Sequence, residues 1–486
     1  MITPKPPSLV DALIPIAALV LMLSLSVYIF GSDSSSGPNQ IVLTMAAAIA
    51  SIVAIRNGHK WGDLQTAIVA GISTAMIAIL ILLSVGALIG TWLMAGTVPS
   101  LIYYGLELLN PSWFFAATCL ICAIAALATG SSWTVAGTLG VALIGVALGL
   151  GQSPAIAAGA VISGAYFGDK MSPLSDTTNL APAVVETDIF SHIQHMAWTT
   201  GPSFILALII FSIIGLGADT TADSSSLQQL MLTLNDNFRI SILALSPLAV
   251  VFFLAFKKTP PLPTILFGAL LGGVLAVFLQ PESVLKFADA PELSRSMALA
   301  KGVWLAMSDG YVSSTGDAVV DDLLTRGGMS SMLNTIWLII TALSFGAILE
   351  HTGMLQRLVE GALKRAKSTG ALVATVVLSC IGINIVAADQ YIAIVLPGKM
   401  YRAEFKRRGL DAKNLSRIIE DSGTLTSPLV PWNTCGAYMA ATLGVATFAY
   451  LPFVFFNLIN PVVSVIYGFT GFTMVRIDET AEAATA

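Results

Sequence analysis

Residues 164–184 read GAYFGDKMSPLSDTTNLAPAV, and residues 418–438 read IIEDSGTLTSPLVPWNTCGAY. Both stretches lie in strongly apolar surroundings, yet each combines acids with hydroxyl, amide and proline residues. Proline removes a backbone donor and clashes with the preceding turn, so a helix cannot run unbroken through either stretch. We predict two interrupted helices, each with unwound backbone and two half-helix ends at its break. The prolines that impose the breaks are Pro173, Pro182, Pro428 and Pro431.

The composition of the whole chain is that of a membrane protein. Of 486 residues, 56% are hydrophobic and only 10% are charged, and the mean hydropathy is +0.83, whereas soluble domains carry about 25% charged residues. A spanning helix needs about 20 apolar residues, and the strand-like alternation of an outer-membrane barrel is missing. We therefore predict an all-α polytopic protein in a lipid bilayer, with no nucleic-acid partner. The long apolar runs are 9–30, 67–95, 196–218, 262–280 and 332–350.

Basic residues indicate which loops are cytoplasmic, because Lys and Arg are enriched there. Lys5 places the N-terminus in the cytoplasm. When the chain is followed from there through the predicted spans and hairpins, the C-terminus, with Arg476 nearby, also lies in the cytoplasm. On this path residues 238–256 form a span that descends to cytoplasmic Lys257 and Lys258. The acidic stretches that then lie outside are the linker 219–237 and the insertion 281–330.

Two apolar segments break the simple alternation of spans. Residues 113–150 lie between two outside points, and residues 371–398 lie between two inside points, so neither is a single crossing. Each is interrupted by polar residues at its middle. We predict two re-entrant hairpins, because non-helical backbone at membrane depth is tolerated where it is buried in protein or lines a cavity. The interruptions are Thr129–Ser132 and Ala388–Gln390.

The two halves of the chain align as an inverted-topology repeat, the layout of many secondary transporters. SVGALI at 84–89 is similar to SFGAIL at 344–349, and each half has three spans, a hairpin, a broken helix and a final span. The predicted units are a first repeat 1–218 (hairpin 113–150, broken helix 155–186), a linker 219–237, a second repeat 238–470 (insertion 281–330, hairpin 371–398, broken helix 415–445) and a cytoplasmic tail 471–486.

The acids within the apolar stretches are the candidate cation ligands, because ionisable groups in a membrane are costly and mark ion pathways or structural pairs. Carboxylates, hydroxyls and carbonyls suit hard cations, and there is no His/Cys cluster for zinc or copper. We expect Na⁺ at Asp169, Asp176, Asp389 and Asp421, and no cofactor. The other candidate site residues are Ser172, Thr177, Thr178, Asn179, Thr129, Ser131, Thr424, Ser427, Asn433 and Thr434.

Alternative roles remain open for these acids. Asp169 and Lys170 could form only an ion pair, Asp176 could cap a helix over Thr177–Asn179, and Asp389 could be a solvated hairpin tip. If one acid is the transport group, desolvation favours its protonated form and a bound cation favours its ionised form. A proton and a sodium ion then compete for it, which yields antiport. Our hypothesis is that Asp169 or Asp176 is that acid, with Asp389 and Asp421 as partners.

Four motifs resemble those of the NhaC-type sodium/proton antiporter family. They are GAYFGDKMSPLSDTTNLAPAV (164–184), EDSGTLTSPLVPWNTCGAYM (420–439), ATGSSWTVAGTLG (128–140) and ADQYIAIVLPG (388–398). The resemblance implies exchange of Na⁺ and H⁺ across a bacterial inner membrane. It also implies membership of the wider ion-transporter superfamily, whose members often form homodimers with an elevator-like motion. Relatives that exchange malate for lactate make an organic-anion antiporter, with small carboxylates as substrates, the alternative.

An enzyme is the competing class, because two intramembrane acids invite comparison with an aspartyl protease. Tyr166 stands where the GxGD motif of such enzymes needs its first glycine, and the HExxH motif of metalloproteases is missing. We therefore expect a transporter and not an enzyme.

His192 and His195 follow the first broken helix, and histidine titrates near neutrality. A pH sensor and a solvated interfacial pair are the two hypotheses. If the pair is interfacial, replacing both with Gln will leave the pH–activity profile unchanged, whereas a displaced profile in exchange assays would establish the sensor.

Overall fold

The computed structural model describes residues 4–30, 34, 37–217, 224–364 and 366–477. Parts of the predicted linker and tail lie outside these ranges. Within them the chain forms helices and two isolated β-bridges, but no strand. Nine of the described helices are long and apolar enough to cross a membrane, or up to 11 spans if two sharply bent pairs are counted. The prediction of an all-α polytopic membrane protein is confirmed.

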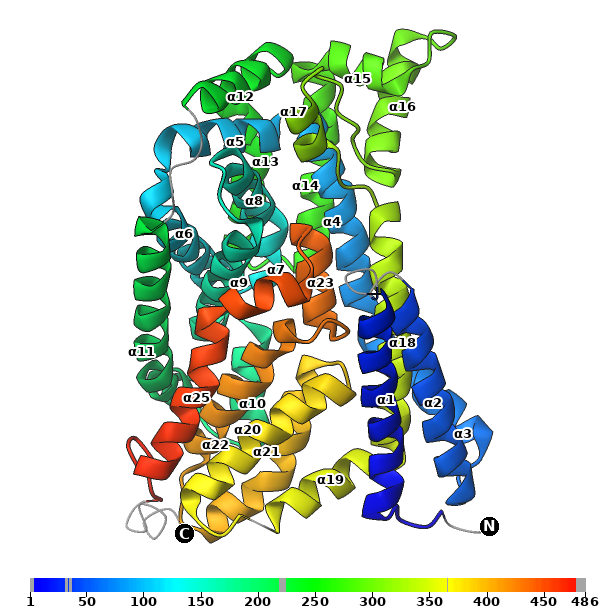
Figure 1. Ribbon diagram of the computed structural model, residues 1–486, viewed down its shortest axis with the longest axis vertical. Coiled ribbons are helices and arrows are strands. Elements are labelled where there is room, and N and C mark those ends of the chain that lie inside the picture. Colours follow the sequence, from blue (N-terminus) through cyan, green and yellow to red (C-terminus); the bar gives the residue numbers. More distant parts are fainter. Residues whose placement is uncertain (1–3, 31–33, 35–36, 218–223, 365, 478–486) are drawn as a thin grey trace.

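α1, α2 and α3 lie in the lower half of the molecule, whereas α4 rises toward the upper end and α5 lies there (Figure 1). A single residue, Ala75, separates α3 from α4, and α5 follows after a left-handed Gly96. α1 and α2 pack side by side, and α2 and α3 both contact α18 from the second half. The bounds are α1 Leu9–Phe30, α2 Pro38–Arg56, α3 Trp61–Thr74, α4 Met76–Met94 and α5 Thr97–Leu108.

Two helix pairs occupy the segments predicted as hairpins. The first pair breaks at Gly130 and Ser131, and the second breaks at Ala387–Asp389, where Ala388 takes a left-handed φ of 59°. α8 lies in the upper half of Figure 1, while α20 and α21 lie in the lower half. The pairs therefore approach the middle from opposite ends; their re-entrant character stays a prediction. The bounds are α6 Phe114–Thr129, α7 Ser132–Val135, α8 Val141–Gly149, α20 Thr369–Val386 and α21 Gln390–Arg407.

Both stretches quoted at the outset are interrupted helices. The first breaks over 172–175, and the second passes through a π-helical turn, Glu420–Thr424, before a longer break that ends at Asn433. Each break is followed by a long helix, α11 or α25, and these two helices pack together. The bounds are α9 Pro154–Met171, α10 Asp176–Val185, α11 Ile189–Leu216, α22 Ala412–Ile419, α23 Thr434–Leu443, α24 Thr447–Tyr450 and α25 Phe455–Thr470.

The predicted single span over 238–256 differs from the structure. α13 has only 11 residues, about 16 Å at 1.5 Å per residue, too short to cross a bilayer core of about 30 Å. The helical segment Ile242–Phe256, which contains α13, is bent by 86° relative to the preceding segment Leu227–Asn237. The insertion 281–330 holds three helices, of which α16 packs against α4. The bounds are α12 Ser224–Asn237, α13 Ser246–Phe256, α14 Pro261–Leu279, α15 Pro281–Ala288, α16 Arg295–Ser308, α17 Ala318–Leu324, α18 Leu333–His351 and α19 Met354–Leu363.

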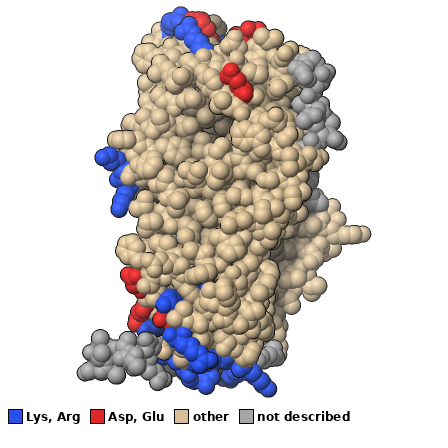
Figure 2. All heavy atoms as spheres, turned by 90° about the vertical axis from the view of Figure 1, so that its left-hand side faces the viewer, with Lys and Arg blue, Asp and Glu red and all other residues tan. Residues whose placement is uncertain are grey.

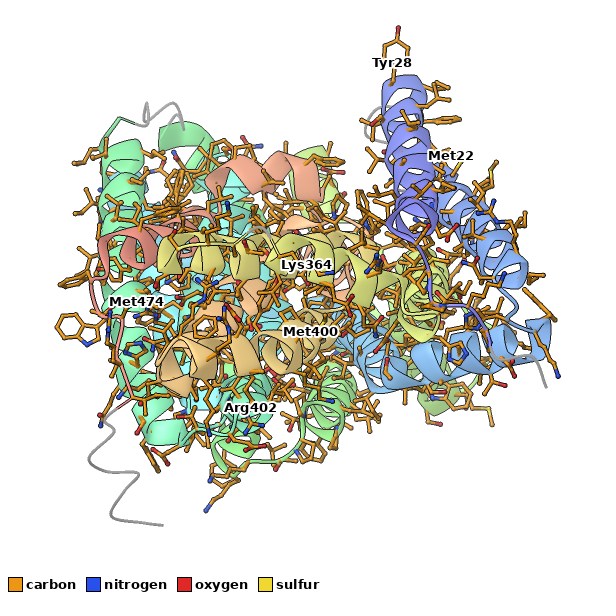
Figure 3. All side chains as sticks on the ribbon, turned by 90° about the horizontal axis from the view of Figure 1, so that it is seen from below. Met22, Tyr28, Lys364, Met400, Arg402 and Met474 are labelled. Carbon is orange, nitrogen blue, oxygen red and sulfur yellow. The ribbon has the colours of Figure 1, made fainter. Side chains whose placement is uncertain are left out.

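Surface charge differs between the two ends of the molecule. On the face drawn in Figure 2, most of the visible lysines and arginines lie at the lower end, and the middle is largely uncharged. Lys364 and Arg402 lie at this lower end when it is viewed from below (Figure 3). The described ends of the chain, residues 4 and 477, also lie there.

Small residues allow α6 and α9 to pack closely. A Cβ added to Gly164 of α9 would lie 2.0 Å from the backbone oxygen of Cys119 in α6. Helix pairs in membranes use such residues because backbone approach, and not the hydrophobic effect, drives their association.

We predict that Gly164→Ala destabilises the protein by about 1–3 kcal/mol, because the helices must separate to admit the methyl group. Gly201→Ala in α11 is the matched control, since nothing lies within 4 Å of its Cβ position. Thermal unfolding in detergent measures both variants. Equal midpoints for the two would contradict the close packing of α6 on α9.

Candidate ion-binding site

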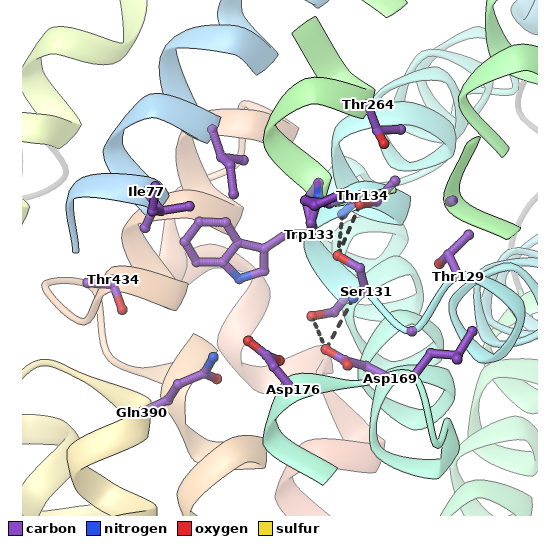
Figure 4. Close-up of a pocket in the computed structure, with 18 of the residues that line it drawn as sticks. Ile77, Thr129, Ser131, Trp133, Thr134, Asp169, Asp176, Thr264, Gln390 and Thr434 are labelled. Atoms are coloured by element: carbon purple, nitrogen blue, oxygen red, sulfur yellow. Dashed lines mark hydrogen bonds between the residues drawn. The ribbon is translucent and has the colours of Figure 1, made fainter. Parts of the chain in front are cut away.

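A cavity of 360 Å³ lies where the two helix-pair tips meet the first helix break. The start of α4 and the turn between α13 and α14 complete its wall. Figure 4 shows Asp169 and Asp176 on one side of this space and the indole of Trp133 extending across it. Its polar lining residues are Thr74, Thr129, Ser131, Ser132, Thr134, Asp169, Asp176, Lys258, Thr259, Thr264, Asp389, Gln390, Tyr391 and Thr434.

Asp169 is the buried acid of the first break. It sits in the last turn of α9 and is 7% exposed. Its Oδ2 accepts hydrogen bonds from the backbone N (3.1 Å) and the Oγ (2.6 Å) of Ser132, at the tip of the first helix pair. Its Oδ1 has no hydrogen-bond partner in the described part of the chain. One oxygen of this carboxylate is therefore fixed, and the hydrogen-bonding capacity of the other is unused within the described residues.

The alternative in which Asp169 forms an ion pair with Lys170 is wrong. Successive residues of a helix point about 100° apart, and here they face different surroundings. Asp169 lines the cavity, whereas Lys170 is fully buried behind it and bonds Asp421.

Asp176 is the exposed acid of the cavity and the first residue of α10. The hydroxyl of Tyr391, from the tip of the second helix pair, donates to its Oδ2, and the backbone N of Thr177 donates to Oδ1 at 2.9 Å. The helix cap is Ser175, whose side chain accepts from the backbone N of Thr178, so the alternative in which Asp176 is the cap is wrong. The Tyr391 bond joins the two halves of the chain across the cavity.

Asp389 is buried, 5% exposed, so the alternative of a solvated hairpin tip is wrong. It caps α21 by accepting from the backbone N of Ile392 at 3.0 Å. The same side chain lines the cavity. Asp389 therefore supports the helix end and contributes negative charge to the cavity.

Only some of the predicted polar ligands line the cavity. Thr129, Ser131 and Thr434 do so. Others hold the helix breaks together: Thr178 donates to the backbone oxygen of Lys170 at 2.9 Å, and Asn433 donates to Asn384 Oδ1 at 3.0 Å. The predicted residues outside the lining are Ser172, Thr177, Thr178, Asn179, Thr424, Ser427 and Asn433.

Asp421 is not part of the cavity, and its predicted place among the Na⁺ ligands needs correction. Its Oδ1 lies 2.5 Å from Lys170 Nζ and accepts from Thr199 Oγ1 at 3.0 Å, while its Oδ2 lies 3.9 Å from Arg417 Nε. Asp421, Lys170 and Arg417 are fully buried. Two cationic side chains lie beside this carboxylate and repel a metal ion, so Asp421 acts as their counter-ion and not as a Na⁺ ligand of the cavity.

The three cavity acids do not converge on one point. In the described ranges, no group of three or more His, Cys, Asp or Glu side chains is placed to hold a metal ion. A cation in this conformation would therefore be held by at most two carboxylates, together with hydroxyl or carbonyl oxygens.

Comparison with known proteins gives the family. Residues 164–472 match the family model described as the Na⁺/H⁺ antiporter family. The chain is 40% identical over 432 residues to the Na⁺/H⁺ antiporter NhaC of Alkalihalophilus pseudofirmus, which covers 89% of this chain and 90% of that protein. The chain belongs to the Na⁺/H⁺ antiporter family. The resemblance drawn from its motifs is confirmed.

Relatives of this antiporter-family chain differ in the substrates that their names give. The malate-2H⁺/Na⁺-lactate antiporter of Bacillus subtilis is 38% identical over 467 residues, covering 96% of this chain and 95% of that protein. Among solved structures, MtrF of Neisseria gonorrhoeae is 14% identical with a TM-score of 0.40, covering 94% of this chain and 95% of that one. The family is thus one of antiporters, and the cavity must decide between cation and anion.

Sequence reasoning missed several residues of this family member that line the cavity or lie behind it. Two of them, Ser132 and Gln390, belong to the predicted interruptions but were not chosen as ligands, and Tyr391 directly follows the second interruption. Glu420 was recognised as an acid of the second broken helix but not chosen as a ligand; it is fully buried, and neither carboxylate oxygen is hydrogen-bonded in the described residues. No comparable signal marked the remaining polar and aromatic lining residues, which are Thr74, Trp133, Thr134, Lys258, Thr259 and Thr264.

The histidine pair is buried, so the interpretation as a solvated pair is wrong, and its position relative to the membrane interface stays a prediction. His192 Nδ1 lies 2.7 Å from Ser416 Oγ, and His195 is 6% exposed. Both lie on α11, close to the Lys170–Asp421 pair.

We predict that Asp421→Asn destabilises this antiporter-family protein by about 3–5 kcal/mol, because Lys170 would keep its charge in an apolar interior without a partner. The double variant Lys170→Met/Asp421→Leu should recover part of that loss, because it removes the unpaired charge of Lys170, while buried Arg417 still lacks its carboxylate. Arg402→Met, which breaks an exposed ion pair with Glu186, is the control and should cost at most about 1 kcal/mol. Thermal unfolding in detergent tests the set, and a double variant as unstable as Asp421→Asn would contradict the account.

Proposed function

We propose that the chain exchanges Na⁺ for H⁺ across a bacterial inner membrane by alternating access. One observation carries the proposal: Asp169 is buried at the meeting point of both halves and lines the cavity, with one oxygen fixed by Ser132 and the other without a hydrogen-bond partner among the described residues. A carboxylate so placed holds either a proton or an alkali cation, and the fixed oxygen keeps its geometry the same in both states.

The neighbouring oxygens supply the remaining ligands in this proposal. Thr129 and Ser131 line the cavity beside Asp169, and Thr434 lies on the opposite wall (Figure 4). Hydroxyl oxygens retain acceptor lone pairs when they donate to backbone, as Thr129 does to Ala125 at 2.9 Å. Asp176 and Asp389 add negative charge that attracts the cation without chelating it.

Alternating access is proposed from the arrangement of the halves. Helix pairs that approach the cavity from opposite ends support an inverted repeat with the predicted unit boundaries. The concentration of Lys and Arg at the end that holds both described termini supports a cytoplasmic location for that end. An elevator-like movement and a homodimer are further expectations from the family resemblance.

An organic-anion antiporter is the second candidate, and Lys258 is the observation that favours it. This lysine lines the cavity and would place an ammonium group near a bound carboxylate. Three aspartates share the same cavity, so the fixed groups repel an anion unless Na⁺ binds with it. Sodium/proton exchange therefore fits the charge of the cavity better. Exchange assays in vesicles with malate and lactate separate the two candidates.

We predict that adding Na⁺ to the purified protein releases protons, and that Asp169→Asn abolishes the release. The apparent Na⁺ affinity should weaken up to tenfold per unit of falling pH where the acid is protonated, because protons and Na⁺ compete for one carboxylate. Release in weakly buffered detergent solution, followed with a pH dye, measures both effects.

Asp63→Asn is the matched control, since Asp63 is an exposed acid in the first turn of α3. It should release protons as the wild type does. Undiminished release from Asp169→Asn, or no release from the wild type, would overturn the proposed exchange.

A further inference from the structure

A second cavity lies at the lower end of the molecule and shares no lining residue with the cation cavity. Its volume of 700 Å³ is within the roughly 300–1,000 Å³ typical of pockets for small ligands. The end of α10, the second half of α21 and the start of α22 form it. Arg402, which lines it, lies at this end of the molecule when it is viewed from below (Figure 3).

The basic side chains of this second cavity come from one side of α21. Lys399, Arg402 and Lys406 all line it. They are three and four residues apart, a spacing that brings side chains to the same face of a helix. All three are exposed, so this face of α21 presents positive charge to a space that solvent or a ligand can enter.

The two acids that line the second cavity are already paired. Both carboxylate oxygens of Glu186 accept hydrogen bonds from the guanidinium of Arg402. Asp411 caps α22 by accepting from the backbone N of Lys413 at 2.9 Å, and its other oxygen lies 3.8 Å from Lys413 Nζ. These acids therefore cancel the charges of Arg402 and Lys413, and they leave the two lysines of α21 without a counter-ion in the cavity.

Lys399 and Lys406 have unused binding capacity. Within the described residues neither ammonium group forms a hydrogen bond or an ion pair. Glu350 of α18 is influenced by the charge of Lys399 but is not bonded to it. Each ammonium group has three donor hydrogens and no acceptor, and lysine binds phosphate groups as a point charge. The expected ligand group is therefore a phosphate.

The rest of the wall favours a phospholipid over a free phosphate ion. Much of it is apolar and includes Val185, Phe405 and Leu410. A phosphate ion makes no use of such a surface, whereas a lipid buries its glycerol and first acyl carbons there. The visible lysines and arginines also gather at this end (Figure 2), and basic pockets between spanning helices on the cytoplasmic side bind anionic lipid head groups.

We propose that this second cavity binds the head group of an anionic phospholipid. The phosphate lies between the ammonium groups of Lys399 and Lys406, and the glycerol lies over the apolar part of the wall. Because α10 of the first half packs against α21 and α22 of the second half, the bound lipid stabilises the contact between the halves. The inference does not depend on which ions the protein exchanges.

A lipid series on the wild-type protein tests the proposal. The thermal unfolding midpoint is measured in a non-ionic detergent while dioctanoyl-phosphatidylglycerol is titrated in, and the midpoint should rise to a plateau. Dioctanoyl-phosphatidylcholine, which has the same chains and no net charge, should raise it little, and so should glycerol phosphate, the soluble head-group fragment. Equal stabilisation by phosphatidylcholine would show unspecific lipid contact, and equal stabilisation by glycerol phosphate would show a site for soluble anions. Either result would overturn the lipid assignment.

Variants of the two lysines locate the site. Lys399→Gln/Lys406→Gln should weaken the apparent affinity for phosphatidylglycerol at least tenfold, because each basic residue near an anionic lipid contributes about fivefold. The matched control is Lys364→Gln/Lys367→Gln, which removes two exposed lysines between α19 and α20 that do not line the cavity. Unfolding without lipid checks that each variant is folded. An unchanged affinity in the first variant, or an equal loss in the control, would contradict the proposed site.

Discussion

Every backbone donor and acceptor inside a membrane must find a partner within the protein, because lipid offers none. This chain breaks helices at four places near its centre, and polar side chains occupy each break. Ser131, Ser175, Asp389 and Asn433 are the caps of the helices that restart there. Most of the hydroxyl and amide groups in the motifs therefore hold unwound backbone in place, and the cavity forms where these supported ends meet.

The acids divide into two separate groups as a consequence of helix geometry. Asp169 and Lys170 are neighbours in sequence, yet one faces the cavity and the other faces the buried Asp421, Arg417 and Thr199. The Lys170–Asp421 pair joins the broken helix of the first half to that of the second half. Any change at Asp169 occurs one residue from this link, so the ligand site and the contact between the halves share one helix turn.

The sequence predicted the architecture well because its signals are local. Long apolar runs give spans, and prolines in the two acid-containing stretches give interrupted helices. The assignment of Asp421 failed for a different reason: its partners Lys170 and Thr199 are more than 200 positions away in sequence, and no local pattern shows a long-range pair. Trp133 was missed likewise, since its ring stacks on Tyr438 from the other half. Lys258 was assigned to a cytoplasmic loop, whereas it lines the cavity. Loop charge indicates a side of the membrane only where the preceding helix crosses the whole bilayer, and α13, with 11 residues, is too short to do so.

The central claim is that one carboxylate, Asp169, holds either a proton or a cation. Infrared difference spectroscopy on Na⁺ addition at mildly acidic pH tests it most directly, because a protonated carboxyl group and a carboxylate absorb at different frequencies. The account predicts that Na⁺ removes a protonated-carboxyl band in the wild type and that this change is missing in Asp169→Asn. The same band change in Asp169→Asn would show that another acid exchanges the proton and would contradict the account.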